Sequence, residues 1–253
     1  MTEILLSGCN GKMGLAITKC VNESYDDCEI VAGIDCLCVQ NSVYPVFNRF
    51  EDFKNHVDVI IDFSSPSILD SLLTYALENK TPIIICTTGL STEQVKKLKI
   101  ASEQIPVFYS RNMSLGVNLI IDLAKKATSI LGDNFDIEII EKHHNQKVDA
   151  PSGTALMLAE EINNTLDNTM VFEFDRHSKI AKRKANEIGI HSVRGGNIVG
   201  EHEVIFAGHD EVISIKHSAT SKDVFAVGAI NAAIYLSKKE KGLYDMKDLI
   251  KNN

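Results

Sequence analysis

A glycine-rich turn near the start of the chain restricts its possible folds more than any other feature. Gly8, Gly11 and Gly14 recur at intervals of three residues, directly after an apolar run and directly before residues with helical spacing. In such a turn, glycines permit a tight reversal, close approach of a phosphate to the backbone and close packing of helix on strand. The N–H groups at the helix N-terminus also attract an anion. The turn favours a dinucleotide-binding βαβ unit, and an ordinary turn between strand and helix is the alternative.

The next predicted strand ends in the acid that dinucleotide-binding units use. Residues 30–34 are apolar, and Asp35 follows them, 21 residues after Gly14. An acidic residue about 20 residues beyond the turn accepts hydrogen bonds from the adenosine ribose. A carboxylate there repels a 2′-phosphate, and the neighbouring Cys36 brings no compensating cation, so we expect NADH to be accepted well. Lys12 could still tolerate NADPH, and the preference between the two cofactors stays open.

Short apolar runs alternate with amphipathic segments through the first 110 residues. Strands are predicted at residues 4–6, 30–34, 57–63, 83–85 and 107–109, and helices after the glycine turn, at Ser65-Pro66 and at the capping box 91–94. Continuous apolar strands are typical of a parallel sheet that is covered on both faces. Strands and helices in alternation predict an α/β fold with a Rossmann-like, doubly wound parallel sheet.

The pattern changes after about residue 115. Helices are predicted over 115–131, 153–166 and 224–236, and strands over 135–140, 170–174, 187–193, 198–206 and 212–217. Several strands with few helices between them are typical of a mixed or antiparallel sheet. We therefore expect a second, α+β domain over residues 115–222. Residues 1–114 and 223–253 would form the dinucleotide-binding domain, because the apolar final helix can pack on it.

The charge balance disfavours some functions. Lys and Arg number 26 against 34 Asp and Glu, which gives a net charge of −8, whereas nucleic-acid binding draws on an excess of cations. The basic run 176–184 is therefore interpreted as a solvated loop between strands, with nucleic-acid contact as the less favoured alternative. No apolar stretch approaches the ~18 residues of a membrane span, and the N-terminus lacks the pattern of a signal peptide. We expect a cytoplasmic protein without a membrane partner.

The cysteines are confined to the first third of the chain. They form no Cys-x-x-Cys pair, and a cytoplasmic chain of this length needs no disulfides. We interpret them mostly as small buried apolar residues and expect no metal site, because the spacing of zinc ligands is absent. The six are Cys9, Cys20, Cys28, Cys36, Cys38 and Cys86.

The chemically densest stretch is residues 141–154, Glu-Lys-His-His-Asn-Gln-Lys-Val-Asp-Ala-Pro-Ser-Gly-Thr. We expect His143, His144 and Lys147 to lie in a loop between a strand and a helix. Neighbouring histidines on one strand point to opposite faces and chelate a metal poorly. The helix that begins after Pro151 places backbone N–H groups and a hydroxyl beside these cations, which makes a site for a carboxylate. A solvated polar loop is the alternative.

The same stretch predicts proton transfer. Lys147 would lower the proton affinity of a neighbouring histidine and keep it able to exchange a proton near neutral pH. Together with the dinucleotide site, this favours a small anionic substrate and a reaction that couples hydride delivery to protonation.

Four motifs that occur in order resemble those of one enzyme family. They are Gly8-x-x-Gly11-Lys-Met-Gly14, Cys86-Thr-Thr-Gly89, Asn112-Met-Ser-x-Gly116-Val-Asn118 and Glu141-x-His-His-x-x-Lys-x-Asp-Ala-Pro-Ser-Gly-Thr154. On these motifs the chain is similar to the 4-hydroxy-tetrahydrodipicolinate reductase (dihydrodipicolinate reductase) family of the diaminopimelate route to lysine. The last motif is highly specific, and the glycine turn is not. Residues 194–202 and 242–246 extend the resemblance over nearly the whole chain.

The resemblance implies an oxidoreductase that uses NADH or NADPH to reduce 4-hydroxy-tetrahydrodipicolinate to tetrahydrodipicolinate. It assigns Gly8, Cys9, Asn10, Gly11, Lys12 and Met13 to the pyrophosphate, Asp35 to the ribose, and Cys86, Thr87, Thr88, Ser110, Arg111, Asn112 and Met113 to the nicotinamide. Members often carry glycine in place of Cys86 and an aromatic residue in place of Met113, and we expect both changes to be tolerated. The basic residue that usually follows the ribose acid is absent, which leaves the NADPH preference open.

For the substrate, a small dianionic heterocycle, the resemblance implies His143 as general acid/base and Lys147 as proton donor. His144, Gly153 and Thr154 would contact its carboxylates. The family's second domain binds this substrate and assembles homotetramers. Arg194 is a weak candidate for a substrate contact. The other histidines, interpreted as structural or exposed, are His56, His177, His191, His202, His209 and His217.

Two other functions remain as alternatives. Another two-domain NAD(P)-dependent dehydrogenase, such as an aspartate dehydrogenase, would explain the glycine turn and Asp35 but not the His-His-x-x-Lys string. A non-catalytic NADH-sensing module would bind the cofactor without oxidising it when substrate is added.

Overall fold

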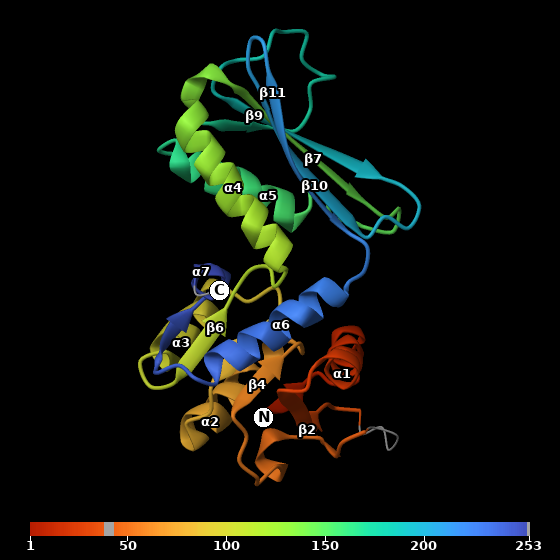
Figure 1. Ribbon diagram of the computed structural model, residues 1–253, viewed down its shortest axis with the longest axis vertical. Coiled ribbons are helices and arrows are strands. Elements are labelled where there is room, and N and C mark those ends of the chain that lie inside the picture. The colour runs from red at the N-terminus through yellow and green to blue at the C-terminus, as the bar shows by residue number, and fades with distance from the viewer. Residues whose placement is uncertain (38–42, 252–253) are drawn as a thin grey trace. The chain divides into compact units, whose positions relative to one another are not determined.

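The chain forms two compact units in the computed structural model, which describes residues 1–37 and 43–251. Unit 1 combines Met1–Leu115 with the segment that begins at Asp223, and unit 2 comprises Gly116–Lys222 (Figure 1). Within the described ranges, no helix is long and apolar enough to cross a membrane.

Unit 1 is built on a seven-stranded sheet in the order β12-β6-β5-β4-β1-β2-β3, in which every neighbouring pair is parallel. The strands are β1 (Thr2–Ser7), β2 (Cys28–Ile34), β3 (Val46–Phe47), β4 (Val59–Asp62), β5 (Ile83–Ile85), β6 (Pro106–Tyr109) and β12 (Gly242–Tyr244). The predicted Rossmann-like sheet is confirmed. The edge strands β3 and β12 were not predicted, because two or three residues are too few to show alternation.

Helices of unit 1 lie on both faces of this sheet. They are α1 (Lys12–Ser24), α2 (Leu69–Asn79), α3 (Thr92–Ala101), α6 (Asp223–Leu236) and α7 (Met246–Lys251), with short 3-10 turns at Phe50–Asp52 and Pro66–Ile68. Successive strand residues point to opposite faces, so Ile4 and Leu6 pack with α1 and α6, whereas Leu5 packs with α2 and α3. The predicted capping box of Ser91 and Gln94 opens α3.

Unit 2 contains a five-stranded mixed sheet in the order β11-β10-β7-β9-β8. Its elements are α4 (Leu115–Leu131), the 3-10 turn Gly132–Asn134, β7 (Asp136–His143), α5 (Gly153–Thr165), β8 (Val171–Glu173), β9 (Glu187–Arg194), β10 (Gly200–Ala207) and β11 (Val212–Ala219). β9 runs parallel to β7 and β8, and β10 runs antiparallel to β7 and β11. The helices α4 and α5 cover one face of the sheet and enclose an apolar cluster (Figure 1). The predicted mixed sheet is confirmed.

The expectation that His143 lies in a loop is wrong. β7 continues to His143, three residues beyond its predicted end, and only His144 and Lys147 lie in the following loop. The polar residues at the end of β7 look like a loop in the sequence. They continue the strand because neighbouring strands on both sides pair with them.

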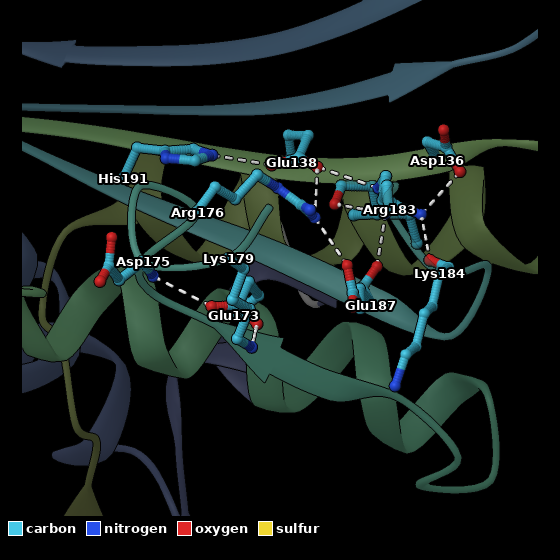
Figure 2. Close-up of polar contacts among 11 residues, drawn as sticks. Asp136, Glu138, Glu173, Asp175, Arg176, Lys179, Arg183, Lys184, Glu187 and His191 are labelled. Carbon is cyan, nitrogen blue, oxygen red and sulfur yellow. Dashed lines mark hydrogen bonds and ion pairs between the residues drawn. The ribbon is translucent and has the colours of Figure 1, made fainter. Parts of the chain in front are cut away.

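The basic run 176–184 lies in the loop between β8 and β9, as predicted, but it is not simply solvated. Ion pairs join Arg176 to Glu187, Lys179 to Glu173, and Arg183 to Glu138 and Asp136 (Figure 2). The side chain of Arg183 is only 16% exposed. Acidic residues of β7, β8 and β9 therefore hold the loop and neutralise much of its charge locally.

Most of the described cysteines fit the predicted apolar role. Cys9, Cys28 and Cys86 are buried and Cys20 is half-buried. Cys36 is exposed and is the exception among the described cysteines, and Cys38 lies outside the described residues. In the described part of the chain, no group of three or more His, Cys, Asp or Glu side chains could hold a metal ion.

Candidate active site

The glycine turn joins β1 to α1 with the geometry that its spacing predicts. Gly8 has a φ of +77°, and a Cβ atom there would lie 2.5 Å from the carbonyl oxygen of Phe63. A Cβ atom on Gly14 would lie 2.4 Å from the carbonyl oxygens of Gly8 and Cys9. The first glycine therefore makes the turn, and the third allows the helix to approach it closely.

The N-terminus of α1 is suited to an anion. Gly11 is its N-cap and provides no side-chain hydrogen bond, and no acidic residue lies in the first turn. A helix start without a side-chain cap has N–H groups for which no side chain competes with a phosphate. The residues present therefore fit a pyrophosphate at this turn.

Asp35 is held against the glycine turn. Its Oδ2 accepts a hydrogen bond from the backbone N–H of Asn10 at 3.0 Å, and its Oδ1 accepts one from Leu37 at 3.0 Å. The side chain of Asn10 also donates to the carbonyl oxygen of Leu37. These bonds connect the turn after β1 to the end of β2, so the carboxylate is oriented without a ligand.

A cavity of about 360 Å³ lies at the carboxyl ends of β4, β5 and β6. Ligands of open α/β sheets bind at this end of the strands. The cavity brings together Met13 and the residues predicted to border the nicotinamide, Cys86, Thr87, Thr88, Ser110, Arg111, Asn112 and Met113. This open space beside the glycine-turn residue Met13 fits the nicotinamide half of a dinucleotide.

Three further residues line this cavity and were not predicted: Phe63, Ser64 and Phe225. Phe63 and Ser64 follow β4 as Cys86 follows β5, so the position of strand ends was a signal for them. Phe225 comes from α6, far away in the sequence, and has no local signal. In the same helix a Cβ atom on Gly228 would lie 1.7 Å from the carbonyl oxygen of Met113, so α6 packs directly behind the cavity wall.

Glu141 lies fully buried at the centre of a polar cluster in unit 2. Its Oε2 is 2.6 Å from Nδ1 of His143, and Arg194 donates to its two carboxylate oxygens at 2.7 and 2.8 Å. Burial acts to raise the pKa of Glu141, but hydrogen bonds from Arg194 and His143 outweigh burial and lower the pKa to about 2. An ionised carboxylate can only accept, so this contact favours the tautomer of His143 that has its proton on Nδ1.

His202 is buried next to His143. The two ring centroids are 5.2 Å apart, and Nε2 of His202 is 3.0 Å from Oγ of Ser152. Burial lowers the pKa of His202 to about 4, and the neighbouring His143 contributes to this shift. His202 is therefore a neutral packing partner of the His143 ring at pH 7, which agrees with a structural role.

Lys147 lies in the loop after β7, with its ammonium 2.8 Å from a carboxylate oxygen of Asp149. Among the groups that lower the pKa of His202, Lys147 contributes least, after burial, His143 and His217. The predicted effect of Lys147 on the histidines of its own loop motif stays a prediction. The charged partner of His143 itself is Glu141. The cluster therefore sets the proton position of His143 through a carboxylate that was not predicted.

The N-terminus of α5 adjoins this cluster. Ser152 is the N-cap: its Oγ accepts from the N–H of Ala155 at 3.2 Å, and its own N–H donates to Glu141 at 3.1 Å. The next residue, Gly153, is exposed, and a Cβ atom there would meet nothing within 4 Å. Glu141 thus connects the start of α5 to the end of β7, and the space beside Gly153 is open.

Glu141 and His202 were not predicted as members of the site, and Arg194 was only a weak candidate for a substrate contact. Glu141 precedes His143 by two residues on one strand, so both side chains lie on the same face, and this spacing was a signal in the sequence. Arg194 pairs with His143 from β9, and His202 pairs with Glu141 from β10. Only the folded sheet brings these two residues to the cluster.

Comparisons with known proteins agree over the whole chain. The family model "Dihydrodipicolinate reductase, N-terminus" matches residues 2–113, and "Dihydrodipicolinate reductase, C-terminus" matches residues 116–250. A 4-hydroxy-tetrahydrodipicolinate reductase of Clostridium novyi is 51% identical over 252 residues, which cover 100% of this chain and 99% of the relative.

Solved structures are similar as well. A dipicolinate-bound dihydrodipicolinate reductase from Paenisporosarcina superposes with a TM-score of 0.81 at 26% identity, and the match covers 97% of each chain. An aspartate dehydrogenase from Thermotoga maritima gives a TM-score of 0.50 at 12% identity, over 94% of this chain and 98% of that one. The second likeness is one of fold alone.

Proposed function

Because the chain belongs to the dihydrodipicolinate reductase family, we propose that it reduces 4-hydroxy-tetrahydrodipicolinate to tetrahydrodipicolinate with NADH or NADPH. This reaction belongs to the diaminopimelate route to lysine. The observation that supports it most is the contact of 2.6 Å between the buried Glu141 and His143, at the start of the highly specific motif of residues 141–154. The alternative of an aspartate dehydrogenase would explain the fold but not this motif.

Unit 1 would hold the cofactor, whose nicotinamide supplies the hydride when bound. The turn from Gly8 to Met13 would receive the pyrophosphate, and Asp35 the adenosine ribose. The cavity at the ends of β4, β5 and β6 would take the nicotinamide. Because a carboxylate repels a 2′-phosphate, we expect NADH to be accepted well and leave the preference over NADPH to measurement.

Unit 2 would hold the substrate and move the proton. His143 would exchange a proton at Nε2 while Glu141 keeps Nδ1 protonated. Lys147 would donate a proton to the ring, and His144 with the N–H groups of Gly153 and Thr154 would bind the substrate carboxylates. Holding a dianionic ring at two carboxylates fixes its orientation, which is itself catalytic.

The family resemblance also supports a homotetrameric, cytoplasmic enzyme with no nucleic-acid or membrane partner. Light scattering on the purified protein measures the mass directly. A single species at four times the chain mass is expected, and a monomer would contradict this part of the proposal.

A parallel assay with NADH and NADPH tests the proposed reaction. The substrate is generated from pyruvate and aspartate semialdehyde, and loss of reduced-nicotinamide absorbance is followed. We expect oxidation that depends on both precursors and proceeds well with NADH, and the parallel assay gives the preference between NADH and NADPH. Cofactor binding without substrate-dependent oxidation would instead identify a sensing module. Oxidation driven by oxaloacetate and ammonia would identify an aspartate dehydrogenase.

A further inference from the structure

Asp62 is a buried carboxylate for which the proposed reaction provides no role. It is the last residue of β4, only 3% exposed, and lies opposite Ser7 of β1 in the sheet register. An ionised group in such a position is costly unless hydrogen bonds compensate for the lost water. Its surroundings therefore show what it does.

Three hydroxyl groups surround this carboxylate. Oγ of Ser7 is 2.7 Å and Oγ of Ser64 is 2.5 Å from Oδ1, and Oγ1 of Thr87 is 2.5 Å from Oδ2. The backbone N–H of Ser64 donates as well. Burial raises the pKa of Asp62, and these donors oppose the rise. An ionised carboxylate can accept hydrogen bonds from all four donors. A protonated carboxyl group would itself carry a donor proton, which would face one of these four donors.

The direction of these hydrogen bonds determines whether the hydroxyl groups can donate a further hydrogen bond or only accept one. A hydroxyl has one proton and two lone pairs. Ser64 and Thr87 give that proton to Asp62, so they present only lone pairs elsewhere. Both residues line the cavity of about 360 Å³, whereas Ser7 does not. This part of the cavity wall is therefore made of hydrogen-bond acceptors.

We propose that Asp62 makes the cavity wall selective for a carboxamide: Ser64 and Thr87 accept its N–H groups and disfavour a carboxylate in its place. The inference rests on the proposed function, which assigns the nicotinamide to this cavity. A carboxylate has no donor and would meet lone pairs, with the negative charge of Asp62 directly behind them. Asp62 thus acts as a positioning residue, through the two hydroxyl protons.

The test compares two dinucleotides by isothermal titration calorimetry. One is NADH, and the other is reduced nicotinic acid adenine dinucleotide, in which a carboxylate replaces the carboxamide. We expect the carboxylate form to bind about 10- to 100-fold more weakly, the range for one buried polar group left unpaired. ADP-ribose, which lacks the nicotinamide, reports whether the rest of the cofactor site is intact.

Asp62→Asn changes the polarity without changing the shape. The amide N–H groups of asparagine donate to at least one of the hydroxyls, which frees that hydroxyl proton to point into the cavity. The ratio between the two dinucleotides should fall to less than a third of its wild-type value, while ADP-ribose affinity stays the same. Ser7→Ala is the matched control: it removes a donor to Asp62 that does not line the cavity, and it should leave the ratio unchanged.

The outcomes separate this inference from the proposed function. If neither NADH nor ADP-ribose binds the wild type, the proposed cofactor site is wrong. If NADH binds but the wild type does not discriminate, or if Asp62→Asn keeps the wild-type ratio, the inference is overturned. Should Asp62→Asn fail to fold, Thr87→Val and Ser64→Ala remove one wall hydroxyl each. An unchanged ratio in both of these would also overturn it.

Discussion

The buried Glu141 carboxylate decides which nitrogen of His143 can exchange a proton. The burial of an ionised carboxylate costs free energy. Here the bidentate hydrogen bonds from Arg194 compensate for that cost. If Glu141 lost its charge, Arg194 would keep only its hydrogen bonds to the backbone carbonyl oxygens of Val193 and Asp149. The Glu141–Arg194 ion pair therefore stabilises the fold locally and also orients the carboxylate that contacts the proposed catalytic histidine.

Glu141→Gln should lower kcat about 100-fold, the lower end of what general acid–base catalysis contributes. An amide can donate to Nδ1 and so no longer keeps the proton there. The affinity for NADH should not change, because Glu141 belongs to unit 2. Steady-state kinetics and calorimetry measure the two effects. Gln146→Ala, at an exposed position of the same motif, is the control and should keep the wild-type kcat. An unchanged kcat in Glu141→Gln would contradict the proposed role of Glu141 in orienting the proton of His143.

The lowered pKa of His202 predicts a pH dependence of stability. Its pKa falls from 6.5 in the unfolded chain to about 4 in the fold, so the unfolded state binds the proton more strongly. The resulting stability is present above pH 6.5 and is lost as the pH falls toward 4, by about 3 kcal/mol in all. Urea denaturation at several pH values measures this loss. The His202→Asn variant should not show this loss of stability between pH 6.5 and 4. The same loss in the variant and in the wild type would show that His202 does not cause it.

At the scale of elements, most of unit 1 could be predicted because its signals are local. The glycine turn, the apolar strands and the capping box at Ser91 each need only a few neighbouring residues. The end of β7 could not, because it is paired with β9 and β10, and Arg194, which binds Glu141, lies 53 residues later. Phe225 reaches the cavity from α6 for a similar reason. Pairing across strands, rather than periodicity along the chain, determines these positions.

Gly14→Ala should weaken NADH binding by at least about 10-fold, because the new Cβ atom would lie 2.4 Å from two carbonyl oxygens and push α1 away from the turn. Calorimetry with NADH measures the loss. Gly195→Ala is the control, since a Cβ atom there meets nothing within 4 Å. Equal NADH affinity in wild type and Gly14→Ala would show that the turn does not hold the cofactor.

Arg183→Ala should destabilise unit 2 by about 2 kcal/mol, because it leaves the half-buried Glu138 without one of its partners. Arg183 also donates to backbone carbonyls of β7 and β9. Chemical denaturation gives the value. Lys182→Ala, at the exposed neighbouring position, should stay within about 0.5 kcal/mol of the wild type. Similar effects of the two substitutions would mean that the loop is simply solvated.

At the scale of the whole molecule, the net charge of the chain has the same sign as the charge of the proposed substrate. The chain carries a net charge of −8, yet the proposed substrate is a dianion. Salt screens charges beyond about 8 Å under physiological conditions, so the cations nearest the ligand dominate its binding. Lys147 is the proposed cation in unit 2, whereas the glycine turn and Asp35 belong to unit 1. Substrate and cofactor affinity should therefore respond to different substitutions.

The most direct test of this division is Lys147→Ala, measured for substrate-dependent oxidation of NADH and, by calorimetry, for NADH affinity. Loss of the ammonium removes both a carboxylate contact and the proposed proton donor. We expect kcat/KM for the substrate to fall at least about 100-fold, with the dissociation constant for NADH unchanged. Full turnover in this variant, or a loss of NADH affinity as large as the loss of kcat/KM, would contradict the proposed roles.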